Sequence, residues 1–338
     1  MAYTTIDNPE LYFQVKIWTG TGSSNALTLD GDEDMQPDYI AIKQRSSTQQ
    51  WHVVNSVSGV QKYFGWNTYA GEETQSQGVT AFGSDGFTVG TDDMVNKSSS
   101  TYVAYCWKES ATSGFDMVAY SGNGSARTIS HSLSAVPGFI LVKDRTNNIG
   151  NTNHNVYHSG NTAAPETEII ALNETSATSD SSIYWNDTAP TSSVFSVGTA
   201  GQVNDASDTY LAKLWAPKQG FSKIGKYTGN GQDTPNGVFV YLGFTPAMIL
   251  IKATDDNSWV IVNNKSPADS NPVDNSLAAN DNAAETTGNS DTTFDFLSNG
   301  FRTNGNSGNN NSSGQKYIYM AFAEAPFVNS NGVPCNAR

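Results

Sequence analysis

The amino-acid sequence predicts an all-β protein with three tandem homologous antiparallel β-sandwich or jelly-roll-like domains. Short hydrophobic runs rich in Val, Ile, Tyr, Phe and Trp are bounded by Gly, Asn, Asp and Ser, which is typical of strands and turns. Three sequence anchors also recur in the same order three times. No run keeps apolar residues at i, i+3, i+4 and i+7, so we expect little helix.

The first anchor is a strand that ends on an aromatic residue and is followed by Gly-X-Gly. The three strands are Phe13–Trp18, Phe115–Tyr120 and Phe221–Tyr227, whose last residues lie 102 and 107 positions apart. The glycine pairs are Gly20 and Gly22, Gly122 and Gly124, and Gly229 and Gly231. Because no helix pattern follows and the third glycine of a dinucleotide fingerprint is missing, we expect tight turns or bulges rather than phosphate loops.

The second anchor is a proline, a hydrophobic strand and a lysine. It runs over Pro37–Lys43, Pro137–Lys143 and Pro246–Lys252. Its continuous apolar stretch predicts a central strand buried on both faces. We expect each lysine to pack its stem and keep its head in water, with a salt bridge between domains as the alternative. Two residues later the first two copies have Arg45 and Arg145, whereas the third has Thr254.

The third anchor is a closing strand of mostly large residues. It spans Thr101–Trp107, Thr209–Trp215 and Lys316–Phe322. Alternate residues of a strand face opposite sides of the sheet, which in the first copy sets Tyr102, Ala104 and Cys106 against Val103, Tyr105 and Trp107. Turn signals at Ser84–Gly86 and Ser298–Gly300 predict hairpins in which glycine supplies a positive φ.

These anchors divide the chain into three β-domains, over residues 12–110, 111–218 and 219–327. A spacing of 102 and 107 residues is far longer than the roughly 20–50 residues of solenoid repeats. Each unit has the length of an ordinary domain and can hold a core of its own. Residues 1–11 and 328–338 fall outside the repeats and are expected to be free segments.

The composition excludes several partners. The formal net charge is −14, and charged residues make up only 15% of the chain, against roughly 25% in an average soluble protein. An acidic surface repels phosphate backbones, so we expect no nucleic-acid partner. No run of about 18 apolar residues occurs, so we expect no membrane insertion. The two cysteines, Cys106 and Cys335, are too distant in sequence to form a framework or a metal site, and Cys106 should be buried.

No motif in the sequence identifies a catalytic residue, so we expect a non-enzymatic protein without a cofactor. A Gly-X-Ser-X-Gly nucleophile elbow is absent. His154 and His158 are four residues apart, but their segment does not have a helical pattern.

The acidic cluster Asp30, Asp32 and Asp34 is a weak metal candidate. Alternating carboxylates could supply oxygen ligands to calcium. An EF-hand loop starting at Asp30, however, would need Gly and Glu where the chain has Met35 and Ala41. We therefore expect a solvated turn and no metal.

Several aromatic residues lie near loops rich in Asn, Asp and Ser. They are Trp51, Trp66, Tyr69, Trp185 and Trp259. Aromatic faces beside amide side chains suit a glycan, and Trp and Tyr are also enriched where proteins meet each other. The sequence therefore makes these residues candidates for glycan or partner contact, with core packing as the alternative.

The sequence also resembles a repeat-containing virion structural protein of tailed bacteriophages, common in marine phages. The resemblance covers about residues 1–328 and rests on these segments: Tyr12-Phe13, Trp18–Gly22, Gln36–Asp38, Ile42–Arg45, Trp185–Gly198 and Tyr319–Phe327. It implies a structural protein on the surface of the virion, with other virion proteins of the tail or capsid as partners. It carries over no catalytic residue.

The resemblance leaves three functions to consider. A tail-associated or fibre component for host adhesion is the main expectation, and a capsid decoration or head-fibre protein is the alternative. A lectin-like module that binds a host-surface glycan is the third. The repeats could surround a pseudo-threefold axis within one chain, or the chain could form a homotrimer. Residues 1–11 and 328–338 would then be free to dock on neighbouring virion proteins.

Overall fold

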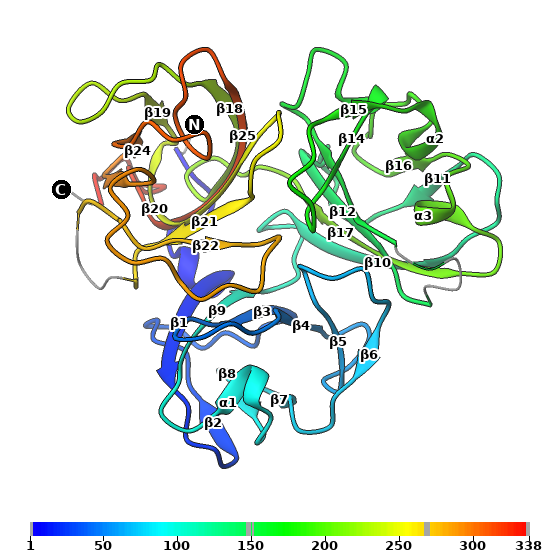
Figure 1. The fold of residues 1–338 in the computed structure, drawn as a ribbon, viewed down its shortest axis with the longest axis horizontal. Helices are drawn as coiled ribbons and strands as arrows, with labels where there is room; N and C mark the ends of the chain where they lie inside the picture. Colours follow the sequence, from blue (N-terminus) through cyan, green and yellow to red (C-terminus); the bar gives the residue numbers. More distant parts are fainter. Residues whose placement is uncertain (1–2, 147–149, 151, 267–270, 336–338) are drawn as a thin grey trace.

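The computed structural model describes residues 3–146, 150, 152–266 and 271–335. Within them the chain is built from antiparallel strands with only short helical turns, which confirms the predicted all-β class. The strands form three units arranged around a common centre (Figure 1). None of the helices in the described residues has the length and apolar character needed to cross a bilayer.

The first unit has a large sheet and a small sheet. The large sheet has the order β1 (Phe13–Thr19), β9 (Thr101–Trp107), β3 (Tyr39–Gln44), β4 (His52–Asn55), β5 (Lys62–Phe64) and β6 (Glu73–Thr74). The small sheet has the order β2 (Asn25–Leu27), β8 (Gly86–Val89) and β7 (Val79–Gly83), and α1 (Asp93–Asn96) follows it. The closing strand β9 therefore lies between the opening strand β1 and the strand of the second anchor, β3.

The second unit repeats this order. Its large sheet is β10 (Phe115–Ser121), β17 (Thr209–Trp215), β12 (Phe139–Asp144), β13 (His154–His158), β14 (Glu168–Ala171) and β15 (Ser179–Asp180). Its small sheet is β11 (Arg127–Ser130) and β16 (Val194–Val197), accompanied by η2 (Pro165–Thr167), α2 (Ser182–Trp185) and α3 (Gly201–Asn204).

The third unit repeats it again. Its large sheet is β18 (Ser222–Thr228), β25 (Lys316–Pro326), β20 (Phe244–Ala253), β21 (Val260–Asn263) and β22 (Leu277–Ala278). Its small sheet is β19 (Phe239–Tyr241), β24 (Gly300–Thr303) and β23 (Phe294–Leu297). Both predicted hairpins are present: β7 and β8 join at Gly83 and Gly86, and β23 and β24 join at Leu297 and Gly300.

Each unit is a sandwich with a core between its two sheets. In the first unit, Tyr102, Ala104 and Cys106 of β9 face this core, together with Phe87 and Val89 of the small sheet. The alternation predicted for the closing strand is therefore confirmed on this face, and Cys106 is buried as expected.

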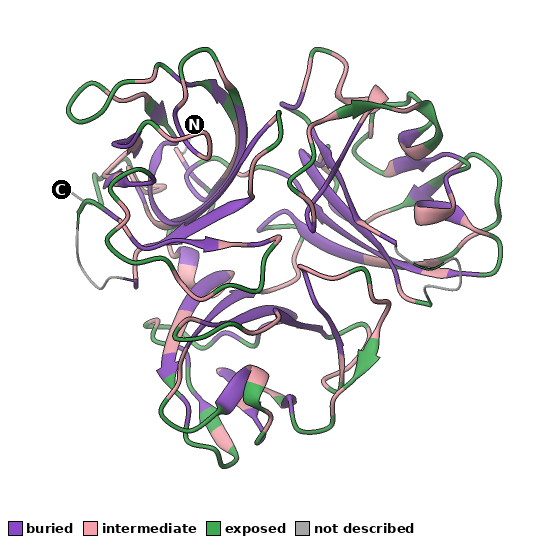
Figure 2. Cartoon of the chain, viewed as in Figure 1, coloured by how far each residue is buried: buried purple, intermediate pink, exposed green. Residues whose placement is uncertain are grey.

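The other faces of the three large sheets meet in one central core. Val103, Tyr105 and Trp107 point into it from β9, and Trp215 and Phe322 occupy the position of Trp107 in the other two units. The rings of Trp107 and Trp215 lie 6.1 Å apart, and those of Trp107 and Phe322 lie 5.7 Å apart. Figure 2 shows buried strands converging on the centre, with exposed segments at the periphery. The units are thus joined by a shared core and do not stack along a line.

The N-terminal segment is not free, contrary to our expectation for residues 1–11. Thr4 is buried, and Ile6 belongs to the central core ahead of η1 (Pro9–Leu11). Its neighbour Asp7 accepts hydrogen bonds from Ser330, so the two ends of the chain contact each other. Residues 1–2 of this segment and residues 336–338 of the C-terminal tail lie outside the described residues.

Candidate functional site

The Gly-X-Gly segments are tight turns held by an asparagine. Gly124 has a φ of 71°, which favours glycine, and a Cβ on Gly122 would lie 1.9 Å from the carbonyl oxygen of Asp205. The backbone N–H of Asn123, between them, donates to Oδ1 of Asn204 at 3.1 Å. The same arrangement occurs at Gly20 and Gly22 with Asn96, and at Gly229 and Gly231 with Asn311. The glycines are therefore structural, and the sequence interpretation missed their asparagine partners.

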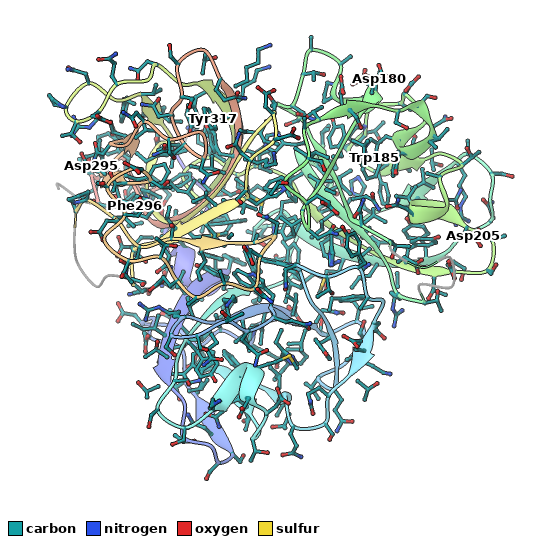
Figure 3. All side chains as sticks on the ribbon, in the orientation of Figure 1. Asp180, Trp185, Asp205, Asp295, Phe296 and Tyr317 are labelled. Carbon is teal, nitrogen blue, oxygen red and sulfur yellow. The ribbon has the colours of Figure 1, made fainter. Side chains whose placement is uncertain are left out.

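The four tryptophans proposed as glycan or partner contacts are buried, so that interpretation is wrong for them. Trp51, Trp66, Trp185 and Trp259 are at most 4% exposed. Figure 3 places Trp185 inside the second unit, whereas Asp205 lies at its outer edge. The reason is that packing between sheets and between units covers positions that in sequence lie beside polar loops. Tyr69 is 43% exposed, and its hydroxyl is hydrogen-bonded to Glu174.

Three side chains at equivalent positions link the units in a ring. His154 begins the strand that pairs with the second-anchor strand, and Trp51 and Trp259 immediately precede the equivalent strands. Trp51 Nε1 donates to the carbonyl of Ala278 in the third unit, at 3.1 Å. In the same way His154 Nε2 bonds Gly65 of the first unit at 3.0 Å, and Trp259 Nε1 donates to Ala171 of the second unit at 2.8 Å. Each unit therefore donates one of these hydrogen bonds to one neighbouring unit and accepts one from the other.

Next to this ring are three equivalent junctions. In junction A, between the first and third units, Arg45 Nη2 lies 2.8 Å from a carboxylate oxygen of Glu285. In junction B, between the second and first units, Arg145 Nε lies 3.0 Å from Glu72. A serine hydroxyl also bonds each glutamate, from Ser266 in junction A and Ser58 in junction B. Salt bridges between units therefore exist, but the arginines form them and the second-anchor lysines do not.

Junction C, between the third and second units, has no such ion pair among the residues that the structure describes. Thr254 takes the place of the arginine, and Thr178 takes that of the glutamate. The equivalence is set by one backbone bond, because the N–H of Glu285, Glu72 and Thr178 donates to the carbonyl of Arg45, Arg145 and Thr254, respectively, at 2.7–2.8 Å. Thr178 Oγ1 donates to Asn161 Oδ1 at 2.7 Å, where the other junctions have serine and glutamate. A cavity of about 390 Å³ lies against Thr254 and Asn161.

The second-anchor lysines are fully buried, so the expectation that their heads reach water is wrong. Lys43, Lys143 and Lys252 have relative exposures of 0%. Lys43 Nζ donates to the carbonyl of Asn282 at 3.2 Å, and Lys143 Nζ donates to that of Tyr69 at 3.0 Å, both in the neighbouring unit. Burial lowers the pKa of Lys43 to about 8 and that of Lys143 to about 7. Carbonyl groups that the neighbouring unit supplies thus replace the lost water.

A fourth buried lysine, Lys213, faces the central core from β17. Its ammonium lies 5.2 Å from the centroid of the Phe64 ring. Burial, followed by the nearby Lys143 ammonium, lowers the pKa of Lys213 to about 7. The equivalent positions in the other units hold Tyr105 and Met320, so the buried charge is specific to the second unit.

The acidic and histidine candidates do not form a metal centre. Within the described ranges, no group of three or more His, Cys, Asp and Glu residues could hold a metal ion. Asp30 is paired with Lys16, whereas Asp32 and Asp34 are exposed. His154 and His158 lie on a strand, and burial keeps the pKa of each below its usual value. Their Nε2 atoms bond carbonyls of different neighbouring units, Gly65 and Tyr319.

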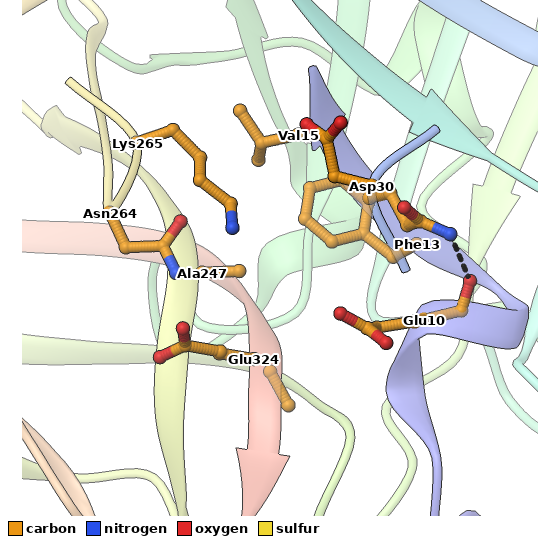
Figure 4. A pocket seen from close by; sticks show the side chains of 10 residues that line it. Glu10, Phe13, Val15, Asp30, Ala247, Asn264, Lys265 and Glu324 are labelled. Carbon is orange, nitrogen blue, oxygen red and sulfur yellow. Dashed lines mark hydrogen bonds between the residues drawn. The ribbon is translucent and has the colours of Figure 1, made fainter. Parts of the chain in front are cut away.

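A smaller hollow lies between the first and third units. Phe13 and Val15 line it from β1, and Lys265 and Glu324 line it from the third unit (Figure 4). Its volume is about 20 Å³, which is room for about one water molecule. It is a packing gap and does not accommodate a larger ligand.

Comparison with known proteins identifies a family whose function is unknown. A family model described as a domain of unknown function (DUF7483) matches residues 8–326. The match begins before β1 and ends on the last residue of β25, so this family comprises all three units and not one repeat. Neither a curated protein nor a solved structure matches the chain.

Proposed function

The chain belongs to the DUF7483 family. From the resemblance of its repeats to virion proteins of tailed bacteriophages, we propose that it is a non-enzymatic structural protein on the surface of a phage particle. The observation that carries the proposal is the closed arrangement of three equivalent units around one core. A single chain then presents a pseudo-threefold surface. Such a surface suits a partner assembled from three equivalent copies, as symmetric assemblies provide.

The shape favours a compact surface component over the shaft of a fibre. A shaft needs units that follow one another along an axis, whereas these units share a central core (Figure 1). The outer loops and small sheets remain for contact, as loops on a rigid scaffold commonly do. We therefore place the chain on the head or tail surface, with other virion proteins as its partners. The net charge of −14 supports a protein partner over nucleic acid.

In this proposal the chain acts as a monomer, because its three units already supply the symmetry that a homotrimer would supply. Sedimentation equilibrium of the purified protein should give the mass of one chain, 36.2 kDa. A single species of three times that mass at micromolar concentration would favour the homotrimer instead.

Particle location is the direct test. Gradient-purified particles of a phage that encodes this sequence should contain the protein at a fixed ratio to the major capsid protein, measured by quantitative mass spectrometry. Gold-labelled antibodies against the chain should decorate intact particles, and a non-virion protein of the same phage is the control. A protein that is abundant in the lysate but absent from purified particles would overturn the proposal. In a particle reconstruction, density on a threefold axis is expected, and density elsewhere would refute the symmetry argument alone.

A further inference from the structure

Junction C departs from the symmetry of the other two junctions. Junctions A and B each have a half-buried ion pair, Arg45–Glu285 and Arg145–Glu72. At junction C the same backbone hydrogen bond joins Thr254 and Thr178, whose side chains are much shorter. Junction C therefore has two short side chains where the other junctions have an ion pair, and one of them, Thr254, lines a cavity.

The open space has the size of a small-molecule site. Its volume is about 390 Å³, within the roughly 300–1,000 Å³ of ligand pockets. The polar side chains that line it are Asn161 and Thr162 from the second unit and Lys226, Thr228, Thr254 and Lys316 from the third. They offer amide, hydroxyl and ammonium groups to a ligand.

The pocket is positively charged in an otherwise acidic protein. Lys226 and Lys316 are both exposed, and no carboxylate lines the pocket. Within the described ranges neither lysine belongs to an ion pair. Asp255 does not line this pocket but an adjoining hollow, together with Lys316.

The strands explain why the two lysines meet here. Thr228 is opposite Lys316 in the register of β18 and β25, and Lys226 is two residues before Thr228 on the same face. Tyr227 and Tyr317 point to the other face, where their rings stack at 4.9 Å in the core of the third unit. No free aromatic face is left for a nucleobase, so hydrogen bonds and charge must provide recognition.

We propose that junction C binds a carboxylated sugar unit. Its carboxylate lies between Lys226 and Lys316, where paired ammonium groups complement one negative charge. Its hydroxyls bond Asn161, Thr162 and Thr254, which can both donate and accept. This proposal goes beyond the structural role and stands whether or not the chain is part of a virion, because it rests on the pocket alone.

Matched pairs of sugars test the proposal on the purified full chain. Digalacturonic acid and sialyllactose serve as acidic probes, α-1,4-galactobiose and lactose as their neutral counterparts, and inorganic phosphate as a simple anion. Isothermal titration at low ionic strength should show at least one acidic sugar binding at least tenfold more tightly than its neutral counterpart. Raising the salt to 0.5 M should weaken that binding, because the charges are exposed.

Two variants link binding to the pocket. Thr254→Arg puts a long side chain at a residue that lines the pocket, Thr178→Glu supplies the partner that the arginine has at junctions A and B, and the double variant should abolish binding. Lys226→Gln with Lys316→Gln keeps the cavity open, changes only exposed side chains, and should weaken binding at least tenfold. Lys97→Gln, an exposed lysine of the first unit, is the matched control and should bind as the natural chain does.

Each other outcome contradicts the proposal. Equal binding of acidic and neutral sugars would show that the two lysines do not bind the carboxylate. Binding of phosphate as tightly as the acidic sugars would show a simple anion site. Unchanged binding by the Lys226→Gln and Lys316→Gln variant would place the ligand elsewhere. Failure of all acidic probes to bind a correctly folded protein would refute the proposed sugar site. It would not bear on whether the protein is incorporated into particles, which is tested separately.

Discussion

Replacing Lys213 with methionine should stabilise the protein at neutral pH. The third unit already has Met320 at this position, so the core accommodates a methionine there. Lys213 is 1% exposed, and its ammonium contacts the Phe64 ring. Replacing a buried charge by an apolar residue of similar volume removes a desolvation penalty that contacts of this kind rarely offset.

The pKa of Lys213 gives the size and sign of the effect. Burial lowers the pKa from 10.5 to about 7, so between these values the unfolded chain binds a proton that the folded chain releases. Stability therefore rises with pH in this window, and the penalty is largest as the pH falls to 7. At roughly 1.4 kcal/mol per pKa unit, the group costs on the order of 4 kcal/mol at pH 7 and about 2 kcal/mol less at pH 9.

Urea denaturation followed by tryptophan fluorescence can measure both quantities. Lys213→Met should raise the free energy of unfolding at pH 7 by about 2–4 kcal/mol and should gain less at pH 9. Lys43 and Lys252 titrate in both proteins, so their contributions cancel in the difference, whereas Lys143 loses the repulsion of the Lys213 ammonium in the variant, which adds to the gain at pH 7. Lys97→Met, at an exposed position, should change neither quantity. A Lys213→Met protein that is less stable at pH 7, or whose advantage does not shrink at pH 9, would refute this reasoning.

Three further predictions concern the repeat contacts and can be checked by the same denaturation measurement. Arg45→Met leaves the buried Glu285 carboxylate without its partner and should cost about 3 kcal/mol, whereas changing both residues to threonine, as in junction C, should cost less. Gly122→Ala should cost about 1–3 kcal/mol, because its new Cβ would meet the carbonyl of Asp205 at 1.9 Å; an unchanged midpoint would contradict the tight-turn assignment. Trp51→Phe should cost about 1 kcal/mol through loss of its hydrogen bond to the carbonyl of Ala278 in the third unit, and a neutral effect would mean that this bond contributes nothing.

The fold was predictable because strand patterns are local. Alternation along Thr101–Trp107 correctly divides its residues between two cores, and Gly86 marks a real hairpin. These inferences need only the period of two residues and the turn preference of glycine. The repeats also predict three units with the same strand order, because equal patterns fold alike.

Burial between units was not predictable in the same way. Trp259 lies beside Asp255, Asp256 and Asn257, which suggests a surface loop, yet the second unit covers it. Lys43 has the pattern of a strand end at the surface, yet its ammonium bonds a carbonyl more than 200 residues away. No local pattern encodes which unit packs on which edge, so both residues were placed on the surface.

The departures from the repeat therefore tell more about function than the repeat itself. Where all three copies agree, as in the Gly-X-Gly turns, the fold is a sufficient explanation. Junction C departs from the other two at Thr254 and Thr178, and a cavity lies against Thr254 there. Unfilled cavities reduce stability, so a cavity that is kept at one junction calls for an explanation other than packing. Local violations of an otherwise consistent pattern concentrate at functional sites, which is why junction C, and not the buried tryptophans, is the place to look for a ligand.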